Sequence, residues 1–223
     1  MEPIQPSQDN PVGIEWIEIP AGEFLYGDDM KRYVVRKAFQ MAKYPITQAQ
    51  YQRFIDANPN YAVPFVDTDW AKMYNWNQKT RRCPPDKLDH PVVLVSWNDA
   101  QEFCRWANCR LPSEVEWEKA ARGEDGRTYP WGEDWIDGRY CNSSESHTGG
   151  TTSVDEFQEG ISPYGVWDMC GNILEWTASP RMGGYVIRGG SWKDSAHWFL
   201  RAAVSYYYNS IDRRDYLGFR CAR

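Results

Sequence analysis

Gly165-Val-Trp-Asp-Met-Cys-Gly-Asn-Ile-Leu-Glu-Trp176 decides the fold class of this chain, together with Arg188-Gly-Gly-Ser-Trp192 and Gly218-Phe-Arg220 downstream. Turn-forming runs such as Tyr129-Pro-Trp-Gly132 separate these stretches, and no helical period survives after Gly123. Short apolar runs between turn residues are typical of strands. A few helices followed by many short strands and loops indicate an α+β domain. We therefore predict an α+β fold that is rich in loops.

Helices are expected in the first half of the chain. A Thr-x-x-Gln capping box followed by apolar residues at helical spacing predicts a helix over about Gln48–Ala57. A second helix is predicted to begin near Trp97, capped by the serine before it or the asparagine after it. A Ser-x-x-Glu capping box predicts a third helix, which begins at Ser113 and stops at Gly123.

Strands and loops complete the expected layout. Apolar residues on either side of Pro20–Gly22 predict two short strands joined by a turn. The stretch Asn58–Leu88 is interrupted by prolines and is expected to form a long irregular loop. We expect a loose lead-in over residues 1–13 and a single domain over residues 14–223.

The composition excludes several functional classes. Aromatic residues make up 15% of the 223 residues, which is too many for a disordered chain. The formal net charge of −6 argues against nucleic-acid binding, because nucleic-acid-binding domains usually have a basic surface. No apolar run approaches the roughly 18 residues of a membrane span, and the N-terminus lacks a signal-peptide pattern. The expected location is by default the cytoplasm, without direct membrane insertion, and a cell or phage surface stays open as the alternative.

The cysteines and histidines form no metal motif in the sequence. The six cysteines include no Cys-x-x-Cys pair, and a chain of this length does not need disulfides to build its core. We therefore expect reduced, buried thiols. His90, His147 and His197 are isolated from one another, which argues against an iron or zinc site built from clustered histidines.

Seven motifs occur in a recognisable order. They are Tyr44-Pro-Ile-Thr-Gln-Ala-Gln-Tyr51, Pro91-Val-Val-Leu-Val-Ser-Trp-Asn-Asp-Ala100, Arg110-Leu-Pro-Ser-Glu-Val-Glu-Trp-Glu-Lys-Ala-Ala-Arg122, Tyr129-Pro-Trp-Gly132 and the three stretches quoted first. From about Ile14 to the C-terminus, the chain resembles the formylglycine-generating enzyme, or sulfatase-modifying factor, family. The resemblance implies the family's variant of the C-type lectin fold, with a small sheet core, few helices and many anchored loops.

The residues that carry the known chemistries of this family are missing. The oxidases of the family resemble one another in having two cysteines between the Gly-Gly-Ser motif and the following Arg-Ala, where the thiolates bind copper and the substrate cysteine. The matching segment here, Trp192–Leu200, contains no cysteine. Sulfoxide synthases on the same fold bind iron through histidines, which the scattered histidines here do not support. We expect neither copper nor iron, and no enzymatic activity.

The segment Arg188–Arg220 resembles the variable region of another branch of this fold, the variable proteins of diversity-generating retroelements. In such systems a template rich in Asn codons is copied with errors at adenines. An AAC or AAT codon can become any codon that ends in C or T, and it can never encode Lys, Glu, Gln, Met or Trp. The resemblance implies a non-catalytic binding protein with a diversified face.

The composition of Val204–Tyr216 agrees with this codon rule. The five forbidden residue types account for 49 of the 223 residues, so about three would be expected in thirteen positions, and none is present. Lys193 and Trp198 are of forbidden types, so the upstream half follows the rule only in part. Tyrosines with serine and asparagine between them are also the composition of an antibody paratope.

We therefore predict a face that binds a variable protein or another macromolecular ligand. Its predicted residues are Asp194, His197, Trp198, Val204, Ser205, Tyr206, Tyr207, Tyr208, Asn209, Ser210, Asp212, Arg214, Asp215 and Tyr216. The charged members Asp212, Arg214 and Asp215 are expected to add charge selectivity at the rim. The alternative is an edge strand and loop whose tyrosines only cover the core.

Two further interpretations concern ions and alternative functions. The resemblance implies a structural calcium ion held by the carboxylates of Asp168 and Glu175 and the carbonyls of Gly171 and Ile173, since hard oxygen ligands suit Ca²⁺. Two other functions stay open. One is an oxidoreductase of the formylglycine-generating or sulfoxide-synthase type with displaced metal ligands, and the other is a sensor or adaptor domain of a signalling protein.

Overall fold

The computed structural model describes residues 10, 12–195 and 197–223. Within this part of the chain there are three α-helices, α1 (Gln48–Ala57), α2 (Trp97–Trp106) and α3 (Glu114–Arg122). The strands in the same residues are β1 (Trp16–Ile19), β2 (Gly22–Tyr26), β3 (Lys31–Val35), β4 (Phe39–Ala42), β5 (Leu174–Arg181), β6 (Gly184–Arg188), β7 (Ser205–Tyr208) and β8 (Leu217–Phe219). The predicted loop-rich α+β class is confirmed.

The capping boxes explain why the helices begin where they do. The side chains of Thr47 and Ser113 each accept a hydrogen bond from the backbone N–H three residues on, and the side chain of that Gln or Glu accepts one from the backbone N–H of the capping residue. Ser96 caps α2 in the same way, and the Asp99 side chain accepts from the Ser96 N–H. These bonds satisfy backbone N–H groups that have no partner within the helix. All three predicted helices are confirmed.

The N-terminal strands differ from the prediction in their pairing. β1 pairs with β4 and β2 pairs with β3, both antiparallel, so the four strands form one long ribbon that bends at Pro20–Ala21. The chain reverses further along, where the Met30 N–H donates to the Gly27 carbonyl. The predicted turn at Pro20–Gly22 is therefore a bend in the ribbon, because each half of the ribbon finds its partner in the returning strands.

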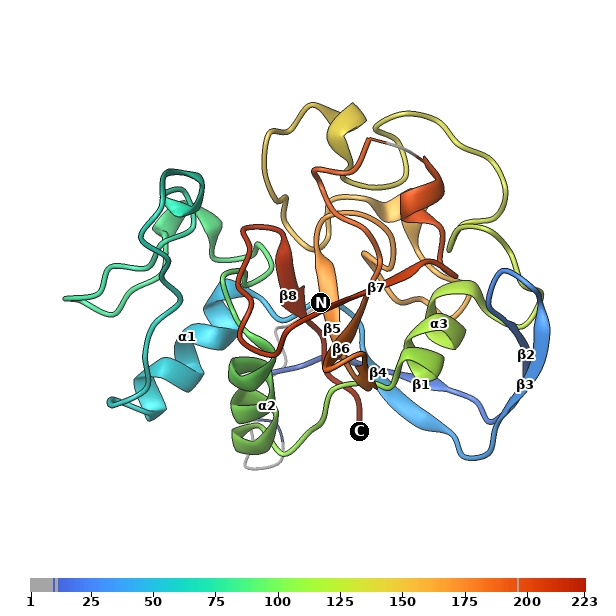
Figure 1. The fold of residues 1–223 in the computed structure, drawn as a ribbon, viewed down its shortest axis with the longest axis horizontal. Coiled ribbons are helices and arrows are strands. Elements are labelled where there is room, and N and C mark those ends of the chain that lie inside the picture. Colours follow the sequence, from blue (N-terminus) through green and yellow to red (C-terminus); the bar gives the residue numbers. More distant parts are fainter. Residues whose placement is uncertain (1–9, 11, 196) are drawn as a thin grey trace.

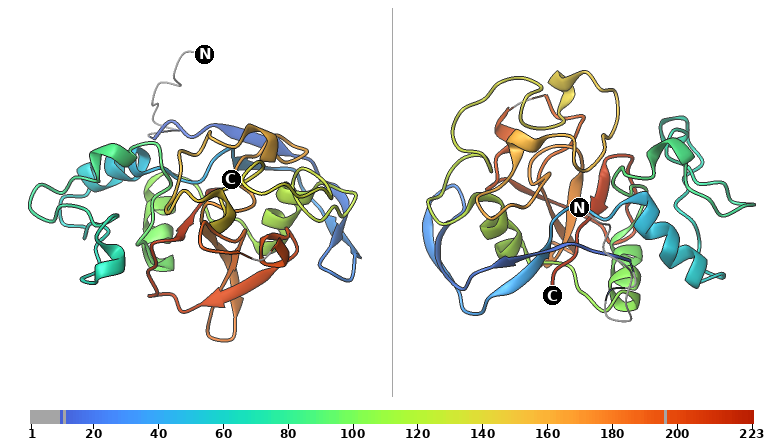
Figure 2. Two further views of the ribbon diagram at one scale, coloured as in Figure 1. Left: turned by 90° about the horizontal axis from the view of Figure 1, so that it is seen from above. Right: turned by 180° about the vertical axis from the view of Figure 1, so that it is seen from behind.

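A four-stranded sheet forms the centre of the domain in the order β7-β6-β5-β8. β5 is antiparallel to β6 and parallel to β8, and β7 is antiparallel to β6. β7 therefore lies at one edge, with one side of its backbone unpaired in the sheet. Figure 1 shows α1 and the irregular segment after it at one end of the long axis and the β2–β3 hairpin at the other, and the views in Figure 2 agree.

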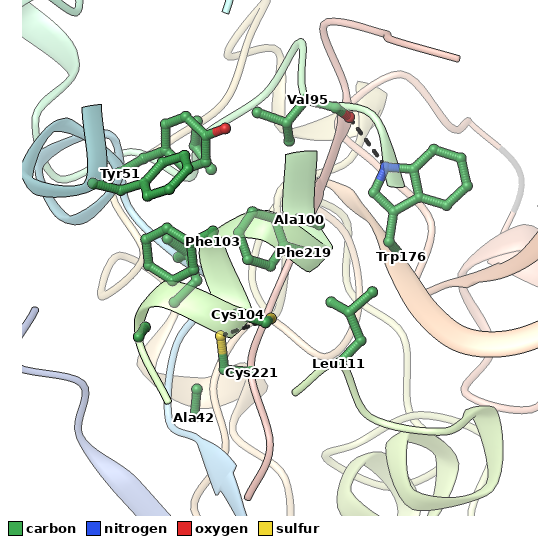
Figure 3. Packing of buried hydrophobic residues seen from close by; sticks show 14 of the residues in the cluster. Ala42, Tyr51, Val95, Ala100, Phe103, Cys104, Leu111, Trp176, Phe219 and Cys221 are labelled. Atoms are coloured by element: carbon green, nitrogen blue, oxygen red, sulfur yellow. Dashed lines mark hydrogen bonds between the residues drawn. The ribbon is translucent and has the colours of Figure 1, made fainter. Parts of the chain in front are cut away.

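Rings from the helices and strands fill the main core between α1, α2 and the sheet. Tyr51 stacks on Phe103 at 5.6 Å between ring centroids, and Phe103 meets Phe219 edge-on at 5.3 Å (Figure 3). The buried Trp176 indole donates to the Val95 carbonyl at 3.1 Å. Offset and edge-to-face ring contacts add to the stabilisation from burial. Aromatic side chains therefore supply much of the packing that aliphatic residues supply in other cores.

The N-terminal residues and the helices bear on two further predictions, the loose lead-in and the absence of a membrane span. The predicted lead-in falls mostly on residues 1–9 and 11, which lie outside the described residues, and Val12 is already a core residue with 2% of its surface exposed. No helix in the described part of the chain combines the length and the apolar character needed to span a membrane.

Candidate functional site

A cavity of about 640 Å³ opens beside the edge strand β7. Most of its lining is aromatic or aliphatic, with a few polar side chains at the margins. The residues that line it are Leu174, Arg181, Met182, Ile187, Ser191, Lys193, Asp194, Phe199, Ser205, Tyr206, Tyr207, Tyr208 and Tyr216. Six of them belong to the predicted binding face. A largely apolar cavity with a few converging polar groups is typical of a ligand-binding site.

The four tyrosines of the cavity fall into an outer and an inner pair. Tyr206 and Tyr207 are 36% and 44% exposed, and the Tyr206 ring lies 6.0 Å from the Phe199 ring. Tyr208 and Tyr216 are half-buried, and their hydroxyl groups lie 3.1 Å apart in a hydrogen bond. Burial raises the pKa of Tyr216, so this hydroxyl stays protonated. The outer pair is available to a ligand, and the inner pair forms the floor.

Charged side chains at the cavity are mostly held by partners within the chain. Lys193 binds both carboxylate oxygens of Asp215 at 2.8 and 2.7 Å, and Asp215 is buried instead of lying at an exposed rim. Asp194 accepts hydrogen bonds from the backbone N–H and hydroxyl of Ser191 at 2.8 and 2.9 Å. These contacts fix the segment that enters the cavity, so a ligand meets ion pairs that are already formed.

The other predicted face residues lie outside the cavity lining. Asn209 and Asp212 close a tight turn by two hydrogen bonds, and the Ser210 carbonyl accepts from the backbone N–H of Asn98. Val204 and Arg214 are half-buried beside this segment. His197 is exposed and stacks on the Trp135 ring at 4.3 Å, while Trp198 is 55% exposed and stacks on Phe199 at 3.5 Å. Ala196, between the predicted Asp194 and His197, is outside the described residues.

Buried arginines hold the segment that carries the tyrosines. Arg188 on β6 donates to the carbonyls of Ala202 and Ala203 at 3.2 and 3.0 Å, just before β7. The same guanidinium pairs with Glu114 and Glu118 of α3 at 3.1 and 3.0 Å. Through these contacts Arg188 anchors the loop between β6 and β7. They fix the backbone of the segment independently of the side chains that face the cavity.

The loop after β7 is held in the same way. Arg213 donates to the Leu94 carbonyl at 2.8 Å and pairs with Asp99 at 2.6 Å, while the Leu94 N–H donates to the Arg214 carbonyl at 3.0 Å. Leu94 adopts a φ of 60°, a left-handed conformation that is uncommon for a leucine. The motif Pro91–Ala100 therefore supplies a rigid support for this loop.

The glycines of the Arg188–Trp192 motif are required by the backbone. Gly189 and Gly190 have φ values of 100° and 69°, which disfavour residues with a Cβ atom. A Cβ on Gly190 would also overlap the side chain of Leu200, and one on Gly189 would press on the Trp117 ring. The motif thus turns the chain tightly from β6 into the segment that lines the cavity.

The residues predicted to hold calcium are engaged in other contacts. The Glu175 carboxylate is fully buried and accepts hydrogen bonds from Arg220 at 2.7 and 2.8 Å and from the Trp117 indole at 2.8 Å. Asp168 accepts from the Asn172 amide at 2.8 Å. A cation bound at Glu175 would lie next to the guanidinium of Arg220, which would repel it. The Glu175 carboxylate therefore does not fit a calcium ion.

No thiol or imidazole lines the cavity among the described residues. Beneath the segment that carries the cysteines in the oxidases, the Cys170 thiol donates to the Leu200 carbonyl at 3.0 Å and lies 3.9 Å from the Cys141 sulfur. Both thiols are buried. The expectation of reduced thiols agrees with the structure, in which all six cysteines are free and five are buried.

A separate group of three thiols was not anticipated from the sequence. The sulfur atoms of Cys104, Cys109 and Cys221 all lie within 4.8 Å of one another. Hydrogen bonds from the Cys104 and Cys221 thiols, with help from Arg223 and Arg110, lower the pKa of Cys109 to about 5. Burial raises the pKa of Cys104 and Cys221. No local spacing signals this group, because Cys221 is 117 positions from Cys104.

The similarity of the chain to known proteins covers nearly its whole length. A family model described as the sulfatase-modifying factor enzyme 1-like domain matches residues 4–223. The chain belongs to the sulfatase-modifying factor family. The inactive C-alpha-formylglycine-generating enzyme 2 of Bos taurus is 30% identical, in a match that covers 94% of this chain and 88% of that protein. The formylglycine-generating enzyme of Streptomyces coelicolor is 35% identical, with coverages of 92% and 88%.

Solved structures establish the fold of this family member. PvdO from Pseudomonas aeruginosa superposes with a TM-score of 0.79 at 22% identity, covering 100% of this chain and 99% of that one. Treponema denticola variable protein 1 superposes with a TM-score of 0.70 at 19% identity, covering 94% of each chain. The fold is thus the C-type lectin-like fold of the sulfatase-modifying factor family, as predicted. Its relatives by sequence include proteins named as formylglycine-generating enzymes and proteins named as inactive.

Proposed function

We propose that this chain is a non-catalytic binding protein whose tyrosine-lined cavity is a diversified face for a protein ligand, produced by a diversity-generating retroelement. The observation that carries the proposal is the position of Val204–Tyr216. This one segment contributes four tyrosines to one cavity, while pairing with β6, the buried Arg188 just before β7 and the Leu94 N–H hold its backbone. The exposed side chains of Tyr206 and Tyr207 can then change from copy to copy without changing the contacts that hold this backbone.

The chemistry of the cavity supports binding by rings and polar side chains. The exposed Tyr206 and Tyr207 offer large amphipathic surfaces that lose little side-chain entropy on binding, as tyrosines do in paratopes. Ser205 and Arg181, joined by a hydrogen bond of 2.8 Å, add polar groups at the margin. The volume of about 640 Å³ suits a protruding side chain or loop of a partner protein.

The experiment that tests diversification is sequencing of the genomic locus. We expect a reverse-transcriptase gene nearby and a template repeat that matches the codons of residues 204–216 except at adenines. A locus with neither feature would contradict diversification. A segment that is invariant among close relatives would instead support a sensor or adaptor domain.

The oxidoreductase alternative has its own test. A relative at 35% identity is named formylglycine-generating enzyme, and the buried Cys170 thiol, with Cys141 beside it, donates to the carbonyl of Leu200 in the segment that follows the Arg188–Trp192 motif. We expect the purified chain to show no oxidation of a cysteine-containing peptide when copper is supplied. Turnover that is lost in a Cys170→Ser variant would overturn the non-catalytic proposal.

A further inference from the structure

The cluster of Cys104, Cys109 and Cys221 is built by two rigid backbone features. The Cys109 N–H donates to the Cys104 carbonyl at 2.9 Å, and Asn108 between them has a φ of 54°. This is the Schellman arrangement that ends α2, and it brings the third residue from the end of the helix close to the third residue after it. The closing bond therefore places Cys109 next to Cys104.

The C-terminal segment brings in the third thiol. Arg110 and Ala222 form an antiparallel bridge with hydrogen bonds of 2.9 and 2.7 Å, and Cys109 and Cys221 are diagonal neighbours across this bridge, with their sulfur atoms within 4.8 Å of each other. The sulfur atoms of Cys104 and Cys221 are 3.7 Å apart (Figure 3). This separation is too long for a disulfide bond of about 2.05 Å. Sulfur atoms bound to one tetrahedral Zn²⁺ at about 2.3 Å lie roughly 3.8 Å apart.

We propose that Cys104, Cys109 and Cys221 form a three-thiolate site for a thiophilic d¹⁰ cation, Zn(II) or Cu(I). Thiolates are the protein ligands that select these ions. Cys109 is half-buried, whereas Cys104 and Cys221 are buried, so Cys109 gives the ion a way in from the surface.

This site is separate from the tyrosine-lined cavity, because none of its three cysteines lines that cavity. Its three cysteines connect the end of α2 to the C-terminal segment that follows β8. A bound ion would join these two parts of the core, as structural metal sites join separate chain segments. The site would therefore stabilise the scaffold that carries the cavity, whether or not the cavity is diversified.

The test is metal binding by the full chain, prepared anaerobically with reductant and then freed of it. Zn(II) is titrated in competition with a chromophoric chelator, Cu(I) with a Cu(I)-specific chelator, and Co(II) is added as a spectroscopic probe. We expect one ion per chain for Zn(II) or Cu(I) and a thiolate-to-Co(II) charge-transfer band. We expect Cys109→Ser to lower the affinity by more than about 100-fold, since even outer-shell partners contribute 10–100-fold.

Cys109→Ser is the informative variant because Cys109 is half-buried, and circular dichroism checks that it folds. Cys83→Ser and Cys170→Ser are the matched controls, since Cys83 lies outside the cluster and Cys170 belongs to the other close thiol pair. Both are expected to bind as the unchanged chain does. Absence of binding for both ions, binding that survives Cys109→Ser, or a Cys104–Cys221 disulfide in chain isolated without reductant would each overturn the proposal.

Discussion

Arg220 and Glu175 form a two-bonded ion pair in the interior, with Nε–Oε2 and Nη2–Oε1 distances of 2.7 and 2.8 Å and no exposed surface on either residue. The pair links the Gly218–Arg220 motif to the Gly165–Trp176 motif, beside the parallel pairing of β8 with β5. Arg220 also donates to the backbone carbonyls of Trp167 and Ala42 at 2.8 and 3.1 Å. One guanidinium therefore fastens the C-terminal strand to the loop before β5 and to β4.

Glu175→Gln is expected to reduce the free energy of unfolding by about 3–5 kcal/mol, because it leaves the buried guanidinium without its counter-charge. Urea unfolding followed by tryptophan fluorescence measures the change. Arg139→Gln is the control, since the Arg139–Glu159 pair is about half exposed and such pairs contribute about 0–1 kcal/mol. Equal losses in the two variants would show that Glu175 does not compensate a buried charge.

Sequence reasoning located the helices because their signals are local. The hydrogen bonds at the start of α1 and α3 join residues three positions apart, so the capping residues Thr47 and Ser113 indicate both helices in the sequence. The buried Arg188 and Arg220 lie in family motifs, and each binds both glutamate side chains and backbone carbonyls. The segment Val204–Tyr216 was found by the resemblance of Arg188–Arg220 to a variable region and by its composition, and the structure places four of its tyrosines at one cavity.

The rest depends on contacts between distant parts of the chain. Lys193 forms an ion pair with Asp215, whose carboxylate is buried. The composition of the segment does not show this pairing. Arg220 occupies the Glu175 carboxylate that the resemblance assigned to calcium. The ribbon of β1–β4 depends on the pairing of β1 with β4 and of β2 with β3, on either side of the bend at Pro20. The three-thiol cluster forms because the C-terminal segment returns to the end of α2. None of these contacts has a local sequence signal.

The outer and inner tyrosines are expected to differ in their effect on stability. Tyr207→Ala should change the free energy of unfolding by less than about 0.5 kcal/mol, as is usual for surface positions. Tyr208→Ala should cost about 1–3 kcal/mol, because Tyr208 packs near the buried Trp176 and bonds to Tyr216. Chemical denaturation of both variants measures this. A cost at Tyr207 as large as at Tyr208 would favour the interpretation that the tyrosines only cover the core.

The attachment of β7 is expected to depend on Gly184. A Cβ atom at this position would overlap the carbonyl group of Tyr208 on the neighbouring strand, so Gly184→Ala should push β7 away from β6. Faster amide hydrogen exchange in Tyr206 and Tyr208 of this variant, with little change in α1, is the expected result. Unchanged exchange in β7 would show that the edge strand tolerates a side chain here and is not held by close backbone contact.

The stability of the domain is expected to fall in acid because of His90. Burial, and then the charge of Lys87, lowers the pKa of this imidazole below its ordinary 6.5, and its Nδ1 lies 2.9 Å from the Thr151 hydroxyl. Below the unfolded pKa the unfolded chain binds more protons than the folded one, so protonation favours unfolding as the pH falls. His90→Gln should lose less stability than the unchanged chain between about pH 7.5 and pH 5, measured by urea unfolding.

His147→Asn, at an exposed left-handed position that suits asparagine, is the matched control and should behave as the unchanged chain does. An identical acid loss in His90→Gln and the unchanged chain would show that other groups control this pH dependence.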